Sequence, residues 1–146
     1  MLLPERYGVP AVGHSRAEWV AIVDDHESMR SSIARALRIE GICTVTFASA
    51  KEYLDHLAPS APCCLVLDMQ LPGMRGLELA QYLDRERPPL PSTIFITGHE
   101  DLWASLDGNI LVHGRLRKPF ELEELLRFVK PLVCGSAAAG ISLRVV

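Results

Sequence analysis

The sequence predicts a three-layer α/β fold, in which helices cover both faces of a doubly wound, five-stranded parallel sheet. Short apolar runs rich in β-branched residues alternate with longer segments of helical periodicity. Ten glycines and ten prolines fall mostly between these segments, as a fold with many short loops requires. The 146 residues are enough for one domain with a sizeable core, and the strand–helix alternation indicates βαβ units.

The first half of the chain carries two strand–helix pairs. The apolar run 19–23 predicts a strand, and residues 27–40 have helical spacing, with Gly41 placed to end that helix. A β-rich run, 42–47, predicts the second strand. Residues 49–57 then open with a capping box and predict a short helix.

The second half repeats the alternation less regularly. Residues 100–109 make a poor helix, and we expect Pro131 to stop the last helix. The predicted elements are strand 63–67, a helix around 77–83, strand 93–96, a short strand at 115–117 and a helix from 122.

Three ranges divide the chain. Residues 1–17 show no period and predict an N-terminal extension, 18–133 form the predicted domain, and 134–146 read as a tail or the start of a linker. A DNA-binding helix pair does not fit after Pro131. A stand-alone domain and a fragment of a longer protein both remain open.

Composition excludes several classes of protein. The chain is 49% hydrophobic and 23% charged, which excludes wholesale disorder. Its 15 Lys+Arg against 18 Asp+Glu disfavour direct nucleic-acid binding, and no apolar run approaches the roughly 18 residues of a membrane span. The N-terminus also lacks the pattern of a secretion signal. We therefore expect a cytoplasmic protein without a membrane or nucleic-acid partner.

The cysteines show neither the C-x-x-C spacing of a metal or redox site nor the density of a disulfide scaffold. We expect them to be reduced and to act as small core hydrophobes. They are Cys43, Cys63, Cys64 and Cys134.

Polar residues follow the predicted strands. Because parallel strands end at one edge of the sheet, where ligands bind, these residues should converge. Three carboxylates there suggest a shared Mg²⁺, while a hydroxyl and an ammonium would complete a site for phosphoryl transfer to a carboxylate. The residues are Asp24, Asp25, Asp68, Thr97 and Lys118.

Over about residues 19–132 the chain resembles the receiver domains of two-component response regulators. This family has a flavodoxin-like (CheY-like) fold with strand order 2-1-3-4-5. The third and fourth matching segments resemble most the receivers that control nitrogen fixation and related transcription. The matches are Asp24-Asp25 after an apolar strand, LVLDMQLPGMRG around Asp68, TIFITGH around Thr97 and RKPF around Lys118.

The resemblance implies a role for each matching residue. Asp68 would be the phospho-acceptor, and Asp25 would bind Mg²⁺ directly. Asp24 would act through a metal-bound water, and the backbone carbonyl of Gln70 would add an oxygen ligand.

Further roles follow at the next two strand ends. Thr97 would be the hydroxyl that follows the phosphoryl group, with Gly98 leaving room beside it. Lys118 would be the conserved cation, followed by a cis peptide to Pro119. The donor would be a phosphohistidine on a sensor histidine kinase or a phosphotransfer protein. Such a domain is a signalling module that catalyses only its own phosphorylation and dephosphorylation.

The chain departs from the family near its fifth strand. Arg115 stands where the family carries an aromatic residue, and the segment from Thr97 to Lys118 is one residue short. The apolar residues 110–112 replace the usual Gly-Ala. These elements and the last helix form the surface through which many receivers dimerise, so a homodimer is possible there. We expect phosphorylation to survive and its readout to be altered.

The sequence fits other functions less well. A pseudo-receiver that binds partners without phosphorylation remains the alternative, favoured by Arg115. A haloacid-dehalogenase-like phosphatase needs a second aspartate where Gln70 stands. A dinucleotide-binding domain needs a glycine-rich first turn, which the chain lacks. His26 and His99 are expected to face solvent, and two phenylalanines, Phe95 and Phe128, to lie in the core.

Overall fold

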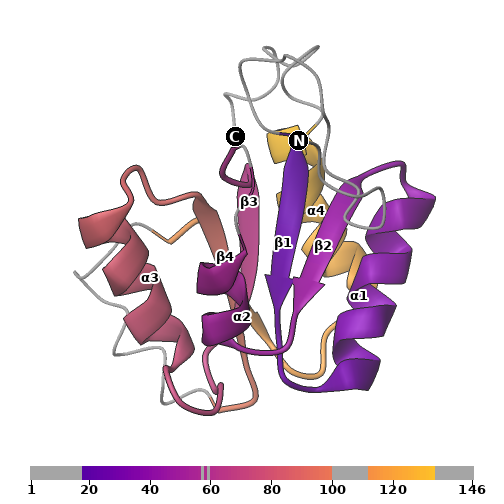
Figure 1. Ribbon diagram of the computed structural model, residues 1–146. Helices are drawn as coiled ribbons and strands as arrows, with labels where there is room; N and C mark the ends of the chain where they lie inside the picture. Colours follow the sequence, from indigo (N-terminus) through magenta and orange to yellow (C-terminus); the bar gives the residue numbers. More distant parts are fainter. Residues whose placement is uncertain (1–17, 57, 59, 100–111, 134–146) are drawn as a thin grey trace.

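A computed structural model describes residues 18–56, 58, 60–99 and 112–133. Its five strands form one parallel sheet in the order β2-β1-β3-β4-β5, as predicted (Figure 1). The strands are β1 Trp19–Val23, β2 Cys43–Phe47, β3 Cys64–Asp68, β4 Ser92–Thr97 and β5 Gly114–Arg117, and the helices are α1 Glu27–Ile39, α2 Ala50–Asp55, α3 Gly76–Glu86 and α4 Leu122–Val133.

The sheet separates two apolar cores, one on each face. Helices α2 and α3 cover one face, and α1 and α4 cover the other (Figure 1). Strand β1 is buried along its whole length, with Trp19 and Ala21 on the α2–α3 face and Val20 and Ile22 on the α1–α4 face. A strand covered on both sides explains the continuous apolar run in the sequence.

Two helix ends confirm the local predictions. At the end of α1, Gly41 has a φ of 81°, and the N–H groups of Gly41 and Ile42 donate to the carbonyls of Arg38 and Leu37 in a Schellman motif. At the start of α2, the Ser49 hydroxyl accepts from the backbone N–H of Glu52 at 3.1 Å.

The prediction that Pro131 ends the last helix is wrong. Helix α4 continues through it to Val133. A proline disturbs only the bond to the residue four positions earlier, and here it lies in the last turn. Leu132 and Val133 pack against the α1–α4 core, which favours continuing the helix.

The predicted core residues are mostly confirmed. Phe95 is fully buried, whereas Phe128 is partly buried against the α1–α4 core. Cys64 is buried, and burial raises the pKa of its thiol well above the ordinary value. Cys43 and Cys63 are partly buried.

Several predictions fall outside the described residues: the N-terminal extension, the helix at 100–109, Ile110, Leu111, Cys134 and the tail. Among the helices that the structure describes, none has the length and apolar character needed to cross a membrane.

Candidate functional site

The predicted residues meet at the carboxyl edge of the sheet. Parallel pairing in register aligns the ends of β1, β3 and β4, with Val23 beside Leu67 and Asp68 beside Ile96. The polar residues that end or follow these strands are therefore brought together from distant parts of the chain. The members are Asp24 after β1, Asp68 ending β3, Thr97 ending β4 and Lys118 after β5.

Asp68 is the central carboxylate and is 1% exposed. Its Oδ2 lies 3.1 Å from Lys118 Nζ, and its Oδ1 accepts a hydrogen bond from the Gln70 backbone N–H at 2.9 Å. Burial raises the pKa of Asp68, and the Asp24 charge adds to the rise, while the Gln70 N–H and Lys118 oppose it. The folded protein thus holds a carboxylate whose charge is only partly compensated.

Asp24 is the second buried carboxylate, also 1% exposed. Its Oδ1 accepts from the His26 backbone N–H at 2.8 Å, and its backbone carbonyl accepts from Arg30 Nη1, also at 2.8 Å. Its Oδ2 lies 3.4 Å from Lys118 Nζ but has no hydrogen-bond partner among the residues that the structure describes. A buried carboxylate oxygen without a hydrogen bond is a position that a cation would satisfy.

A divalent cation fits this cluster. One ligand atom from each of Asp24, Asp25, His26 and Asp68 lies within 4.8 Å of the others. Lys118 supplies one positive charge against the two buried carboxylates, and the Asp25 side chain is 35% exposed, so it remains accessible to an entering ion. Mostly oxygen ligands that are partly open to water suit Mg²⁺.

His26 contributes more to the site than the sequence indicated. Its side chain is 67% exposed, as expected, yet its Nδ1 lies 3.4 Å from Asp24 Oδ1 and 3.3 Å from Asp25 Oδ1. No motif pointed to this contact. Only its position directly after the two aspartates could have suggested it.

Thr97 and Lys118 are joined through the backbone. The Lys118 N–H donates to the Thr97 carbonyl at 2.8 Å, and the buried Thr97 hydroxyl accepts from the exposed His99 backbone N–H at 3.1 Å. Within the described part of the chain, a Cβ added at Gly98 would meet Lys118 Cβ alone, at 4.0 Å. The peptide between Lys118 and Pro119 is cis, as the resemblance implied.

Gly76 is a supporting residue that the sequence analysis did not single out. A Cβ there would lie 2.2 Å from the backbone oxygen of Asp68, so α3 can begin this close to the site only with glycine. The available signal was the last glycine of LVLDMQLPGMRG.

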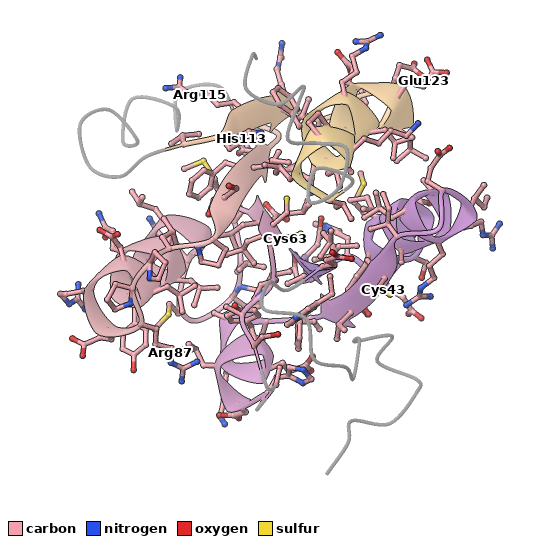
Figure 2. All side chains as sticks on the ribbon, turned by 90° about the horizontal axis from the view of Figure 1, so that it is seen from above. Cys43, Cys63, Arg87, His113, Arg115 and Glu123 are labelled. Atoms are coloured by element: carbon pink, nitrogen blue, oxygen red, sulfur yellow. The ribbon has the colours of Figure 1, made fainter. Side chains whose placement is uncertain are left out.

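Arg115 lies away from the cluster. It pairs in register with Phe95 and is exposed, and Figure 2 shows it at the outer edge of the molecule. Strand β5 alternates buried and exposed residues, with Leu116 inside and Arg115 and Arg117 outside. The family's usual aromatic position is therefore held here by a cation on the surface.

Comparisons with known proteins agree with the geometry. The sequence model of the response regulator receiver domain family matches residues 20–130. Nodulation protein W of Bradyrhizobium diazoefficiens is 40% identical over 120 residues, covering 78% of this chain and 52% of that protein. The DNA-binding transcriptional regulator NtrC of Escherichia coli is 36% identical over 112 residues, covering 76% and 24%. The chain spans only part of the length of these relatives.

Solved structures give the same result. The response regulator StyR is 33% identical with a TM-score of 0.68, covering 79% of this chain and 58% of that one. The receiver domain of NtrX from Brucella abortus is 26% identical with a TM-score of 0.67, covering 78% and 97%. The fold, the acidic cluster and the family match together establish that this chain belongs to the response regulator receiver domain family.

Proposed function

We propose that this receiver domain accepts a phosphoryl group on Asp68 from a sensor histidine kinase or a phosphotransfer protein, with Mg²⁺ bound at the acidic cluster. One observation carries the proposal: the buried Asp68 carboxylate lies 3.1 Å from Lys118 Nζ, inside a group of ligand atoms that fits a divalent ion.

The proposed reaction is a direct transfer. An Asp68 oxygen attacks the phosphorus of a phosphohistidine, the new P–O bond forms as the P–N bond breaks, and the imidazole nitrogen leaves with the bonding pair. Bound Mg²⁺ would supply positive charge to the phosphoryl oxygens. We assign Asp25, Asp68 and the Gln70 carbonyl as its direct ligands, and Asp24 as a ligand through water.

Two further groups would act on the phosphoryl oxygens. Lys118 already contacts the acceptor carboxylate, so its ammonium is placed to stabilise charge that develops during transfer. The Thr97 hydroxyl would donate to a phosphoryl oxygen, with Gly98 beside it leaving space. The backbone bond between Lys118 and Thr97 would keep both groups at one end of the pocket.

The readout of phosphorylation would differ from that of most receivers. An exposed arginine at position 115 does not pack inward as an aromatic ring would, because moving a guanidinium charge into the apolar core is unfavourable. Phosphorylation would instead change the charge balance near Arg115 and Arg117 on β5. A homodimer through the surface around β5 and α4 is one arrangement that such a change could control.

Intact-mass spectrometry after incubation with acetyl phosphate and Mg²⁺ tests the proposal. The expected result is the mass gain of one phosphoryl group, which is lost in Asp68→Asn and retained in Asp55→Asn, an exposed aspartate on α2. A gain that survives Asp68→Asn would exclude Asp68 as the acceptor.

The absence of any gain in the folded wild-type protein would favour a pseudo-receiver that binds partners without phosphorylation. For the readout, NMR spectra recorded before and after phosphorylation should show small shifts around Arg115. Large shifts of the kind that accompany an inward ring movement would contradict the altered readout.

A further inference from the structure

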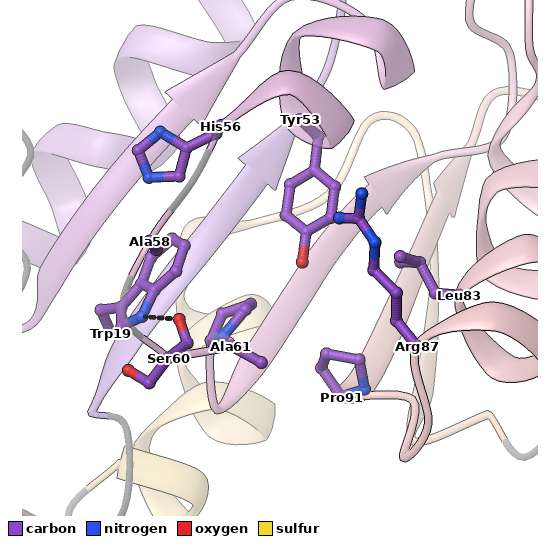
Figure 3. A pocket seen from close by; sticks show the side chains of 10 residues that line it. Trp19, Tyr53, His56, Ala58, Ser60, Ala61, Leu83, Arg87 and Pro91 are labelled. Atoms are coloured by element: carbon purple, nitrogen blue, oxygen red, sulfur yellow. Dashed lines mark hydrogen bonds between the residues drawn. The ribbon is translucent and has the colours of Figure 1, made fainter.

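A cavity lies at the amino edge of the sheet, opposite the edge that carries the acidic cluster. It has a volume of about 210 Å³ and is lined by residues from α2, from the loops that precede β3 and β4, and from the end of α3 (Figure 3). Trp19, at the first position of β1, forms part of its wall. Asp24 is five positions after Trp19, which at the rise of a strand is roughly 16 Å, so the cavity is distinct from the acidic cluster.

The size and walls of the cavity suit a single aromatic ring. An apolar cavity of about 150 Å³ is large enough to bind benzene, so 210 Å³ leaves room for a ring with one small substituent. Trp19 is 1% exposed, and its indole N–H is satisfied by the Ser60 carbonyl at 3.2 Å, which leaves the ring to act as an apolar wall. Leu83 and Pro91 complete the apolar lining.

The Tyr53 hydroxyl is the donor inside this cavity. Tyr53 is 8% exposed, and Figure 3 shows its hydroxyl directed into the space between Ala61 and Pro91. Among the described residues the hydroxyl has no hydrogen-bond partner. Burial raises its pKa to about 12, so it carries its proton at neutral pH. A hydroxyl that keeps its proton and lines the cavity can donate to a ligand with an acceptor group.

Arg87 supplies positive charge at the rim. Within the part of the chain that the structure describes, its guanidinium donates only to the Leu54 carbonyl, at 3.4 Å, and pairs with no carboxylate. No aspartate or glutamate is among the described lining residues. His56 also lines the cavity, and burial lowers its pKa, so it adds no charge at neutral pH. The net charge around the cavity is therefore positive and suits an anion.

We propose that this cavity binds a small monocyclic aromatic carboxylate, with its ring against Trp19 and its carboxylate accepting from the Tyr53 hydroxyl and the Arg87 guanidinium. The ring supplies the apolar contact and the carboxylate supplies the acceptor and the charge. Neither an isolated anion nor a neutral ring satisfies both features. The proposal does not depend on phosphorylation of Asp68.

A ¹H–¹⁵N NMR titration of the full chain tests it, with benzoate as the probe. Two matched controls are used: acetate, which lacks the ring, and benzyl alcohol, which lacks the charge. For a ligand of this size we expect a benzoate Kd of about 1 mM, with shifts confined to the amides around the cavity. Acetate and benzyl alcohol should each bind at least about tenfold more weakly, since each lacks one of the two features.

Variants connect the binding to the two polar groups. Arg87→Gln should weaken benzoate binding about tenfold and leave benzyl alcohol binding unchanged. Tyr53→Phe keeps the ring and should weaken benzoate binding several-fold. Arg85→Gln, in the last turn of α3 and not among the lining residues, should change nothing. Equal benzoate affinity in wild type and Arg87→Gln would overturn the proposal. Three other results would also overturn it: benzoate-induced shifts only elsewhere in the protein, no benzoate binding by wild type, or wild-type affinity for acetate or benzyl alcohol equal to that for benzoate.

Discussion

The two edges of the sheet bury polar groups in opposite ways. The carboxyl edge buries the carboxylates Asp24 and Asp68 against a single ammonium. At the amino edge the hydroxyl of Tyr53 lines a cavity with aromatic and aliphatic walls, and Arg87 lies at its rim. Both edges belong to the same five strands, so the difference comes from the residues placed at the strand ends and not from the architecture.

Burial raises the pKa of both Asp68 and Tyr53, but with different consequences. Tyr53 has an ordinary pKa of about 10, so the rise leaves it neutral at physiological pH and carries no penalty there. Asp68 ordinarily ionises near pH 4, so at neutral pH its charge is held at a cost in folding free energy. Carboxylates with perturbed pKa values gather at functional sites, so the difference supports the proposal that phosphoryl transfer takes place at the carboxyl edge.

The largest expected effect tests how closely the carboxyl edge is packed. Gly76→Ala places a Cβ 2.2 Å from the Asp68 backbone oxygen, and we expect a loss of about 3 kcal/mol in the free energy of unfolding. Gly73→Ala is the control, because its added Cβ meets nothing within 4 Å and only its φ of 78° is unfavourable, at about 1 kcal/mol. Urea denaturation measures both. Equal losses of unfolding free energy in the two variants would show that α3 can move away from the Asp68 backbone to accommodate the added methyl group.

The next-largest effect concerns Tyr53 at the amino edge and appears in the pH dependence of the free energy of unfolding. The pKa of Tyr53 is raised to about 12 in the folded protein, so above its ordinary pKa of about 10 the unfolded state loses the proton first. Stability from this group is therefore lost as pH rises from about 10 to about 12. We expect wild type to lose about 2 kcal/mol more than Tyr53→Phe over this range in chemical denaturation. Parallel curves for the two proteins would contradict the assignment.

A smaller effect comes from the cation at the carboxyl edge. Mg²⁺ at ten times its Kd should stabilise the wild-type protein by about 1.4 kcal/mol, since it binds the folded state. Asp25→Asn should remove most of this gain, because it changes a proposed direct ligand, whereas Asp55→Asn should keep it. Thermal denaturation with Mg²⁺ and with EDTA gives the comparison. The same gain in Asp25→Asn would place the ion elsewhere.

The smallest effect concerns Asp68 itself in the absence of divalent ions. The pKa of Asp68 is raised on folding, so the folded state binds its proton more tightly, and the group destabilises the protein at pH values above its folded pKa. Asp68→Asn should therefore be about 1 kcal/mol more stable than wild type at neutral pH, with Lys118 still paired to Asp24.

This gain should shrink as pH falls through the folded pKa and vanish below about pH 4, where both states are protonated. Asp55→Asn, whose side chain is 64% exposed, should show little change at any pH. A less stable Asp68→Asn at neutral pH would show that the contacts of Asp68 with Lys118 and Gln70 outweigh its burial.

Features fixed by local chemistry could be predicted from the sequence. The apolar run 19–23 ends abruptly at two aspartates, and the structure confirms a fully buried strand there. Gly41 at the end of α1 and the cap at Ser49 were likewise predictable, because each depends on residues adjacent in the chain. The strand order, in contrast, followed from the resemblance to the receiver family.

Features that depend on distances across the fold could not be predicted. The contacts of His26 with two carboxylates depend on its side-chain orientation, and the requirement for Gly76 depends on how closely α3 approaches β3. The continuation of α4 past Pro131 reflects packing against the core, which overrode the local signal. The cavity beside Tyr53 is formed by four separate segments and leaves no pattern in the chain.

Lys118 is held at two points: its backbone N–H binds the Thr97 carbonyl, and its ammonium contacts Asp24 and Asp68. The ends of β1, β3 and β4 are thus linked through one residue that lies outside every strand. A shift of the β4 terminus would move Lys118 and so change the distances from its ammonium to the carboxylates of Asp24 and Asp68. Substituting this single side chain would remove the contacts with Asp24 and Asp68 together and leave the backbone bond to Thr97 in place, an outcome that no exchange of one aspartate can reproduce.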